Sequence, residues 1–125
     1  MIQAKKKIVA ALEDLMFTVK ISDIAKRTGL AVEFVKTEKD ALEAASQHPL
    51  LMIIDLNMHS FDPLQLIHTL KADAHTSRIS LIGYVSHVNG ELKQKAHDAG
   101  CDMVMARSAF SQNLPLILKR HSNAA

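Results

Sequence analysis

The 125-residue sequence is poor in the residues that cross-link a small fold or give it an aromatic core. It has no tryptophan, one tyrosine and one cysteine, Cys101. A single cysteine excludes an internal disulfide and a cysteine-rich metal cluster, and it fits a protein of the reducing cytoplasm. Aromatic residues make up only 4% of the chain, so we expect a core of aliphatic side chains and methionine. The hydrophobic fraction of 48% is too high for a disordered chain.

Long apolar runs and a strong charge of one sign are also missing. No apolar stretch approaches the roughly 18 residues of a membrane-spanning helix. Glu13 and Asp14 interrupt the apolar run after Lys5–Lys7 too early for a signal peptide. The formal net charge of +2 is too small to argue for direct contact with nucleic acid. The glycines are isolated along the chain, which speaks against a dinucleotide-binding or P-loop enzyme.

Short apolar runs alternate with longer amphipathic segments along the chain, as expected for alternating strands and helices. The most apolar run, 50–56, shows no polar alternation and is typical of a central parallel strand buried on both faces. The expected strands are 8–12, 31–35, 50–56, 79–85 and 103–106. The expected helices are 17–28, one capped by Thr37 that ends before Pro49, 62–72 with Asp62 as its cap, 90–99 and 111–120, followed by a frayed tail over 122–125.

This alternation predicts an α/β fold with a parallel five-stranded sheet between two layers of helices. Right-handed crossovers leave few topologies for such a sheet. At this length we expect the flavodoxin-like doubly wound (βα)5 fold, a three-layer sandwich with strand order 2-1-3-4-5. No linker, repeat or low-complexity segment divides the sequence, so we expect residues 1–125 to form a single domain.

Ligands of such folds bind at the carboxyl ends of the strands, near the switch point between the first and third strands. Three carboxylates fall at this edge, because Glu13 and Asp14 follow the first strand and Asp55 ends the third. Like charges this close repel one another. We therefore expect either a divalent cation such as Mg²⁺ or an ion pair between Asp55 and Arg107, which follows the fifth strand. A plain polar strand end is the alternative for Asp55.

The order and spacing of these residues resemble the receiver domains of bacterial two-component response regulators. The resemblance runs from 7 to 119, and its strongest part is 51–58, LMIIDLNM, which looks like the family's phosphoacceptor strand. It implies that Asp55 accepts a phosphoryl group from a histidine kinase or phosphotransfer protein, and that the main-chain carbonyl of Asn57 binds Mg²⁺. Arg107 stands at the spacing of the family's lysine.

Phosphoryl transfer to a carboxylate needs an in-line nucleophile, a metal and a cation near the phosphoryl oxygens. Asp55 is then the nucleophile and Arg107 the cation, while a contact of Ser86 with the phosphoryl group would pull its loop inward as a switch. The expected metal ligands are Glu13, Asp14, Asp55 and Asn57, and the expected phosphoryl-contact or switch residues are Ser86, Arg107, Val85 and Tyr84.

The sequence also departs from the family pattern. An ungapped comparison puts Leu12 where the family has an acid, so one acid is lost or shifted. It puts Val85 where the family has Thr or Ser, unless a small bulge restores Ser86. The switch aromatic of the fifth strand falls near Val104, and Tyr84 either acts differently or simply packs. These departures favour an alternative, a pseudo-receiver that works as a phosphorylation-independent protein-interaction module.

The preferred hypothesis is a signalling domain and not an enzyme, in which phosphorylation of Asp55 switches a protein contact. By resemblance, the downstream protein binds the face of the fourth helix, fifth strand and fifth helix, and a homodimer is left open. A third hypothesis is a small flavodoxin-like enzyme or cofactor binder, against which the scarcity of aromatics and glycines at the strand ends speaks. His87 lies beside the site as a pH-sensitive contact or, more commonly, an exposed loop residue.

Overall fold

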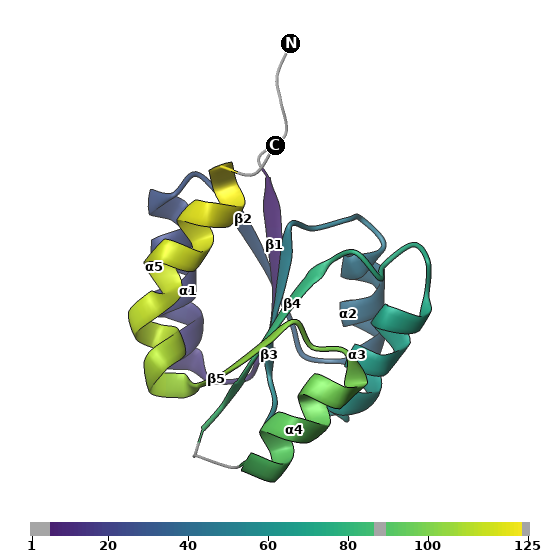
Figure 1. Ribbon diagram of the computed structural model, residues 1–125. Coiled ribbons are helices and arrows are strands. Elements are labelled where there is room, and N and C mark those ends of the chain that lie inside the picture. Colours follow the sequence, from purple (N-terminus) through teal and green to yellow (C-terminus); the bar gives the residue numbers. More distant parts are fainter. Residues whose placement is uncertain (1–5, 87–89, 124–125) are drawn as a thin grey trace.

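The computed structural model describes residues 6–86 and 90–123. Five parallel strands form one sheet in the order β2-β1-β3-β4-β5, which confirms the expected flavodoxin-like fold. Helices α1 and α5 cover one face, and α2, α3 and α4 cover the other (Figure 1). No helix of the described residues is long and apolar enough to span a membrane. The elements are β1 (Lys7–Ala11), α1 (Leu15–Arg27), β2 (Ala31–Val35), α2 (Glu38–Ala45), β3 (Leu51–Asp55), α3 (Pro63–Ala72), β4 (Ser80–Val85), α4 (Gly90–Ala99), β5 (Met103–Ala106) and α5 (Arg107–Asn123).

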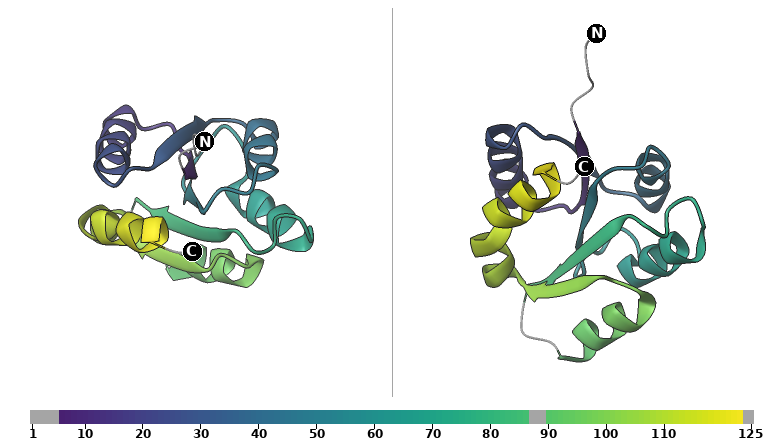
Figure 2. Two further views of the ribbon diagram at one scale, coloured as in Figure 1. Left: turned by 90° about the horizontal axis from the view of Figure 1, so that it is seen from above. Right: turned by 45° about the horizontal axis from the view of Figure 1, so that its top comes forward.

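The sheet lies between two helix layers and supplies a separate apolar core to each (Figure 2). Successive side chains of a strand point to opposite faces. In β3, Met52 and Ile54 belong to the core under α2, α3 and α4. Leu51 and Ile53 belong to the core under α1 and α5, and all four are fully buried. The apolar run of β3 is therefore that of a central strand covered on both sides, as the sequence predicts.

Most helix boundaries follow local capping signals. The side chains of Thr37 and Asp62 accept hydrogen bonds from backbone N–H groups in the first turns of α2 and α3, as expected. The predicted start of the first helix at Phe17 is wrong by two residues, since α1 begins at Leu15. The reason is that Asp14 caps α1, accepting a hydrogen bond from the backbone N–H of Phe17 at 3.1 Å.

The last helix departs furthest from the prediction. It begins at Arg107, directly after β5, and not at Ser111. Pro115 suggests a helix start because proline is favoured in a first turn, yet here it lies inside the helix. The helix also continues through Ser122 into the expected tail, whose last two residues, 124–125, lie outside the described part.

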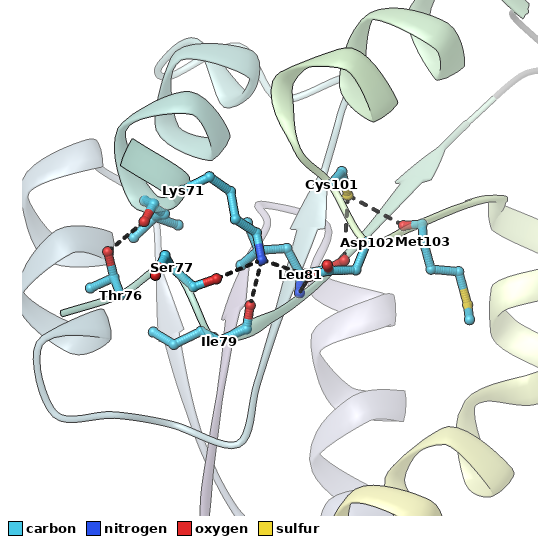
Figure 3. A network of polar contacts seen from close by, with 9 residues as sticks. Lys71, Thr76, Ser77, Ile79, Leu81, Cys101, Asp102 and Met103 are labelled. Atoms are coloured by element: carbon cyan, nitrogen blue, oxygen red, sulfur yellow. Dashed lines mark hydrogen bonds and ion pairs between the residues drawn. The ribbon is translucent and has the colours of Figure 1, made fainter. Parts of the chain in front are cut away.

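A polar network ties α3 to the amino ends of β4 and β5, at the opposite end of the sheet from Asp55 (Figure 3). The Lys71 ammonium donates to the carbonyl oxygens of Ser77 and Ile79 at 3.0 and 3.1 Å. It also pairs with Asp102 at 2.9 Å, and the same carboxylate oxygen accepts the backbone N–H of Leu81 at 2.8 Å. This network fixes the loops at the amino ends of β4 and β5, away from the candidate site.

Candidate functional site

Asp55 lies at the carboxyl end of β3, paired in register with Tyr84 of β4. Its side chain is partly buried, and its Oδ1 accepts the backbone N–H of Asn57 at 2.9 Å. Burial raises the pKa of Asp55, and the negative charges of Glu13 and Asp14 act in the same direction. The backbone N–H of Asn57 and the positive charge of Arg107 lower the pKa of Asp55, but they only partly oppose this increase. The folded protein therefore holds a proton on Asp55 more tightly than water-exposed Asp does.

Asn57 connects the loop after β3 to the loop after β4. Its side-chain oxygen accepts the backbone N–H of Ser86 at 2.7 Å. The ladder between β4 and β5 runs regularly to Val85, which pairs with Ala106, so the register there leaves no bulge before Ser86. Val85 is fully buried in the core on the α3 and α4 side, whereas Ser86 is exposed. Of the two, Ser86 is the one placed at the edge of the site.

Arg107 reaches Asp14 across the gap between α5 and α1. Its guanidinium forms a hydrogen-bonded ion pair with the Asp14 carboxylate and lies over the Phe17 ring at 4.9 Å. The Phe17 N–H and then the Arg107 guanidinium lower the pKa of Asp14 below its usual value. An ion pair of Arg107 with Asp55 was one expectation; the structure gives Arg107 to Asp14, since both residues lie at helix starts on the same face of the sheet.

Glu13 is turned toward the loop before α3. Its carboxylate accepts the backbone N–H of Ser60 at 3.3 Å, and hydrogen bonds from Ser60 lower the pKa of Glu13. Within residues 6–86 and 90–123, no three acidic, histidine or cysteine side chains gather into a group that could hold a metal. In this arrangement the carboxylates do not fit a divalent cation, because Asp14 is held by the α1 cap and Arg107. Binding of Mg²⁺ by these residues stays a prediction.

Tyr84 lies in an aromatic cluster under α1 and α5. Its ring stacks on Phe110 at 5.3 Å and meets the edge of Phe17 at 5.1 Å between centroids. Its hydroxyl is buried and has no hydrogen-bond partner among the described residues. Burial raises the pKa of Tyr84, so the phenol stays neutral. This environment is that of a packing residue; a switch role for Tyr84 stays a prediction.

A pocket of about 550 Å³ opens between the first turns of α1 and the start of α5. It adjoins the Asp55 edge through Ser86 and Arg107, and sequence reasoning missed it because the expected start of the last helix lay at Ser111. Residue 87, predicted beside the site, lies outside the described part of the chain. The described lining residues are Met16, Phe17, Lys20, Ser86, Ala106, Arg107, Ser108 and Ser111.

Solved structures with the same architecture are signalling proteins. The phosphorylated cyanobacterial phytochrome response regulator RcpA is 20% identical, with a TM-score of 0.78 over 94% of this chain and 91% of that chain. The receiver domain of a sensor histidine kinase from Pseudomonas aeruginosa PAO1, with a magnesium ion in its active-site cleft, is 16% identical, with a TM-score of 0.81 over 97% and 100%. The signal receiver domain of a signal transduction histidine kinase from Syntrophus aciditrophicus is 21% identical, with a TM-score of 0.80 over 95% and 90%.

No protein-family model and no curated protein matches the chain. The likeness is therefore one of structure, and it extends over nearly the full length of each solved chain compared. The strand order and the helix layers agree with the resemblance noted in the sequence. The chain has the fold of response regulator receiver domains.

Proposed function

We propose that this chain is a signalling domain that works by contacting other proteins without accepting a phosphoryl group, as a pseudo-receiver and not as an enzyme. The ion pair between Arg107 and Asp14 carries the proposal. Arg107, the cation expected at a phosphoryl group, is paired with Asp14 at the start of α1. Asp14 is itself one of the carboxylates expected to bind Mg²⁺. Asp14 is occupied by the helix cap and the ion pair, and Arg107 is occupied by the ion pair. These contacts favour a fixed interaction module over a phosphorylation switch.

A second candidate function is the phosphoryl-accepting receiver of a two-component system. It is supported by Asp55, whose partly exposed carboxylate ends the central strand and keeps its second oxygen free of any described hydrogen bond. In this candidate the carboxylates would rearrange before Mg²⁺ could bind. Its residues are Asp55 as phosphoacceptor, Glu13, Asp14 and Asn57 as further metal ligands, and Ser86 and Arg107 at the phosphoryl group.

Both candidates act through protein partners. A histidine kinase or phosphotransfer protein is the upstream partner that the second candidate requires. By resemblance, a downstream protein binds the face of α4, β5 and α5, where Met103 is 45% exposed. A homodimer through this face is the remaining alternative.

Beryllofluoride, a phosphoryl mimic, tests the proposal. It is added with millimolar Mg²⁺ to isotope-labelled protein and to Asp55→Ala, while the amide signals of Asp55, Asn57 and Ser86 are followed. We expect no saturable shift in either protein. A receiver domain known to bind beryllofluoride, measured in parallel, shows that the reagents are active. Saturable shifts that disappear in Asp55→Ala would overturn the proposal and establish the phosphoryl-accepting candidate.

A further inference from the structure

The pocket between α1 and α5 has the features of a ligand site that the proposed function does not use, although the phosphoryl-accepting candidate would share its lining residues Ser86 and Arg107. We propose that it binds a small organic anion, with the charged group beside Lys20 and Arg107 and the apolar body against Met16 and Phe17. The ligand class is a carboxylate or phosphate monoester with an aliphatic or aromatic body. The proposal goes beyond the proposed function and concerns the protein with Asp55 unmodified.

The size and walls of the pocket suit a small molecule. Its volume of about 550 Å³ lies within the range of roughly 300–1,000 Å³ that is common for such sites. Phe17 is only 5% exposed and contributes the rigid inner edge of the pocket beside Arg107, since its ring packs on Tyr84 and Phe110. Met16, in contrast, has a flexible side chain that is 83% exposed and free to cover an apolar ligand.

Exposed apolar side chains also lie on α1 outside the pocket lining. Leu15 and Val19 are 76% and 61% exposed, and their spacing of four residues places them on one side of the helix. Together with Met16 they account for most of the large apolar side chains that the described residues expose. A cluster of this kind on a small protein marks a binding surface more often than chance exposure.

The charges of the pocket select an anion. The described lining residues include two cations, Lys20 and Arg107, and no carboxylate. Asp14 neutralises Arg107, whereas Lys20 donates to the Ser111 hydroxyl and has no carboxylate partner within residues 6–86 and 90–123. A carboxylate or phosphate placed here would receive charge-assisted hydrogen bonds, which are stronger than neutral ones. A cation or a neutral ligand would leave Lys20 uncompensated.

The same charges argue against a second copy of this chain as the occupant. A symmetric contact through this face brings Lys20 of each copy toward the same positive pocket of the other, and like charges repel. Ser86, Ser108 and Ser111 also line the pocket, and the Ser111 hydroxyl accepts a hydrogen bond from Lys20. A pocket of this volume with a few polar groups suits a small ligand, whereas a protein partner needs a larger surface.

The sole tyrosine offers a direct reporter of occupancy. Tyr84 packs against the Phe17 wall, and the sequence has no tryptophan to obscure its fluorescence. The charges of Asp14 and Arg107 also act on its buried hydroxyl. An anion that draws Arg107 away from Asp14 changes the field at this phenol. Binding is therefore expected to change Tyr84 fluorescence as well as the amide signals of Ser108 and Ser111.

Four probes separate the chemical classes: hexanoate, phenyl phosphate, 1-hexanol and inorganic phosphate. Each is titrated into the labelled full chain, and the amides of Ser108 and Ser111 are followed with Tyr84 fluorescence. We expect saturable binding of hexanoate or phenyl phosphate, roughly tenfold tighter than the neutral alcohol or inorganic phosphate. Which of the two anions binds more tightly shows which combination of head group and apolar body the pocket prefers. Equal affinity for anionic and neutral probes, or for inorganic phosphate and phenyl phosphate, would overturn the proposal.

Matched variants on α1 test the site itself. Lys20→Gln removes the unpaired cation, and we expect it to weaken binding of the anionic probe roughly tenfold. Lys26→Gln lies on the same helix outside the pocket lining and should leave binding unchanged. Both positions are on the helix surface, so thermal unfolding curves confirm that each variant folds. Equal loss of affinity in the two variants, or shifts that never saturate with any of the four probes, contradicts a small-anion site.

Discussion

Arg107 and Asp14, 93 positions apart in the chain, form an ion pair that joins the start of α5 to the start of α1. The same Asp14 caps α1 by accepting the N–H of Phe17, and the same Arg107 lies over the Phe17 ring. Two residues with expected roles at a phosphoryl group thus hold one helix layer together. The pair also borders the pocket proposed for an organic anion, so that stability and ligand binding meet at Arg107.

The two roles of Asp14 can be separated by substitution. Asp14→Ala removes both the helix cap and the ion pair, and we expect it to lower the free energy of unfolding by about 1–2 kcal/mol. Asp14→Asn keeps an oxygen that accepts the Phe17 N–H and should cost clearly less. Urea unfolding at neutral pH measures both. Asp62→Ala, which removes the cap of α3 without an ion pair, gives the cost of a cap alone. If Asp14→Asn is as harmful as Asp14→Ala, the ion pair and not the cap is the dominant contribution.

Asp55 is expected to reduce stability at neutral pH, because burial raises its pKa in the folded state. The folded protein then binds this proton more tightly than the unfolded chain, so the stability of the wild type falls as pH rises from about 3.9, the ordinary value, through the raised pKa. Asp55→Asn has no such titration and can still accept the Asn57 N–H. We expect the variant to be more stable than the wild type near pH 7, with the difference shrinking toward pH 4.

Urea midpoints measured across that pH range decide the sign. Asp62→Asn is the control, because the Asp62 carboxyl likewise accepts backbone N–H groups but lies exposed at the start of α3, whereas Asp55 is partly buried. A wild type that is more stable than Asp55→Asn at neutral pH would mean that the charged carboxylate gains more from its surroundings than burial costs it. That result would point to a cation near Asp55 and would favour the phosphoryl-accepting candidate.

Local signals in the sequence predict the elements and the strand order well. Caps such as Thr37 and Asp62, and the apolar run that ends at Asp55, depend on neighbours a few residues away. The candidate site is harder, because its geometry depends on residues far apart in the chain. The position at which α5 begins determines which carboxylate pairs with Arg107. Pro115 wrongly suggests a later start, because it lies inside the helix.

Side-chain direction is the second quantity that the sequence leaves open. Val85 and Ser86 are both plausible at the end of β4, and only the pairing of Val85 with Ala106 shows which one enters the core. The contact between Phe17 and Phe110 likewise joins two distant helices. Its only trace in the sequence is the scarcity of aromatic residues, which makes each one a strong candidate for the core.

Lys71 is expected to support the fold without affecting the pocket. Its buried stem and its three acceptors lie at the far end of the sheet, in the network of Figure 3. Lys71→Met keeps the stem but leaves the carbonyls of Ser77 and Ile79 without this donor. We expect a loss of about 2 kcal/mol in the free energy of unfolding. Titration of Lys71→Met with the anionic probe should give wild-type affinity, and a weakened affinity would show that the two ends of the sheet are coupled.

Tyr84 is expected to carry a hydroxyl that costs stability. The group is buried and has no hydrogen-bond partner among the described residues, and a buried unsatisfied polar group is unfavourable. Tyr84→Phe removes the hydroxyl and keeps the ring between Phe17 and Phe110. We therefore expect the free energy of unfolding to rise by up to about 1 kcal/mol, measured in urea. Tyr84→Leu, which loses the stacking as well, should instead be destabilised by about 1–3 kcal/mol. A Tyr84→Phe variant less stable than the wild type would instead reveal a hydrogen-bond partner for the hydroxyl beyond the described residues.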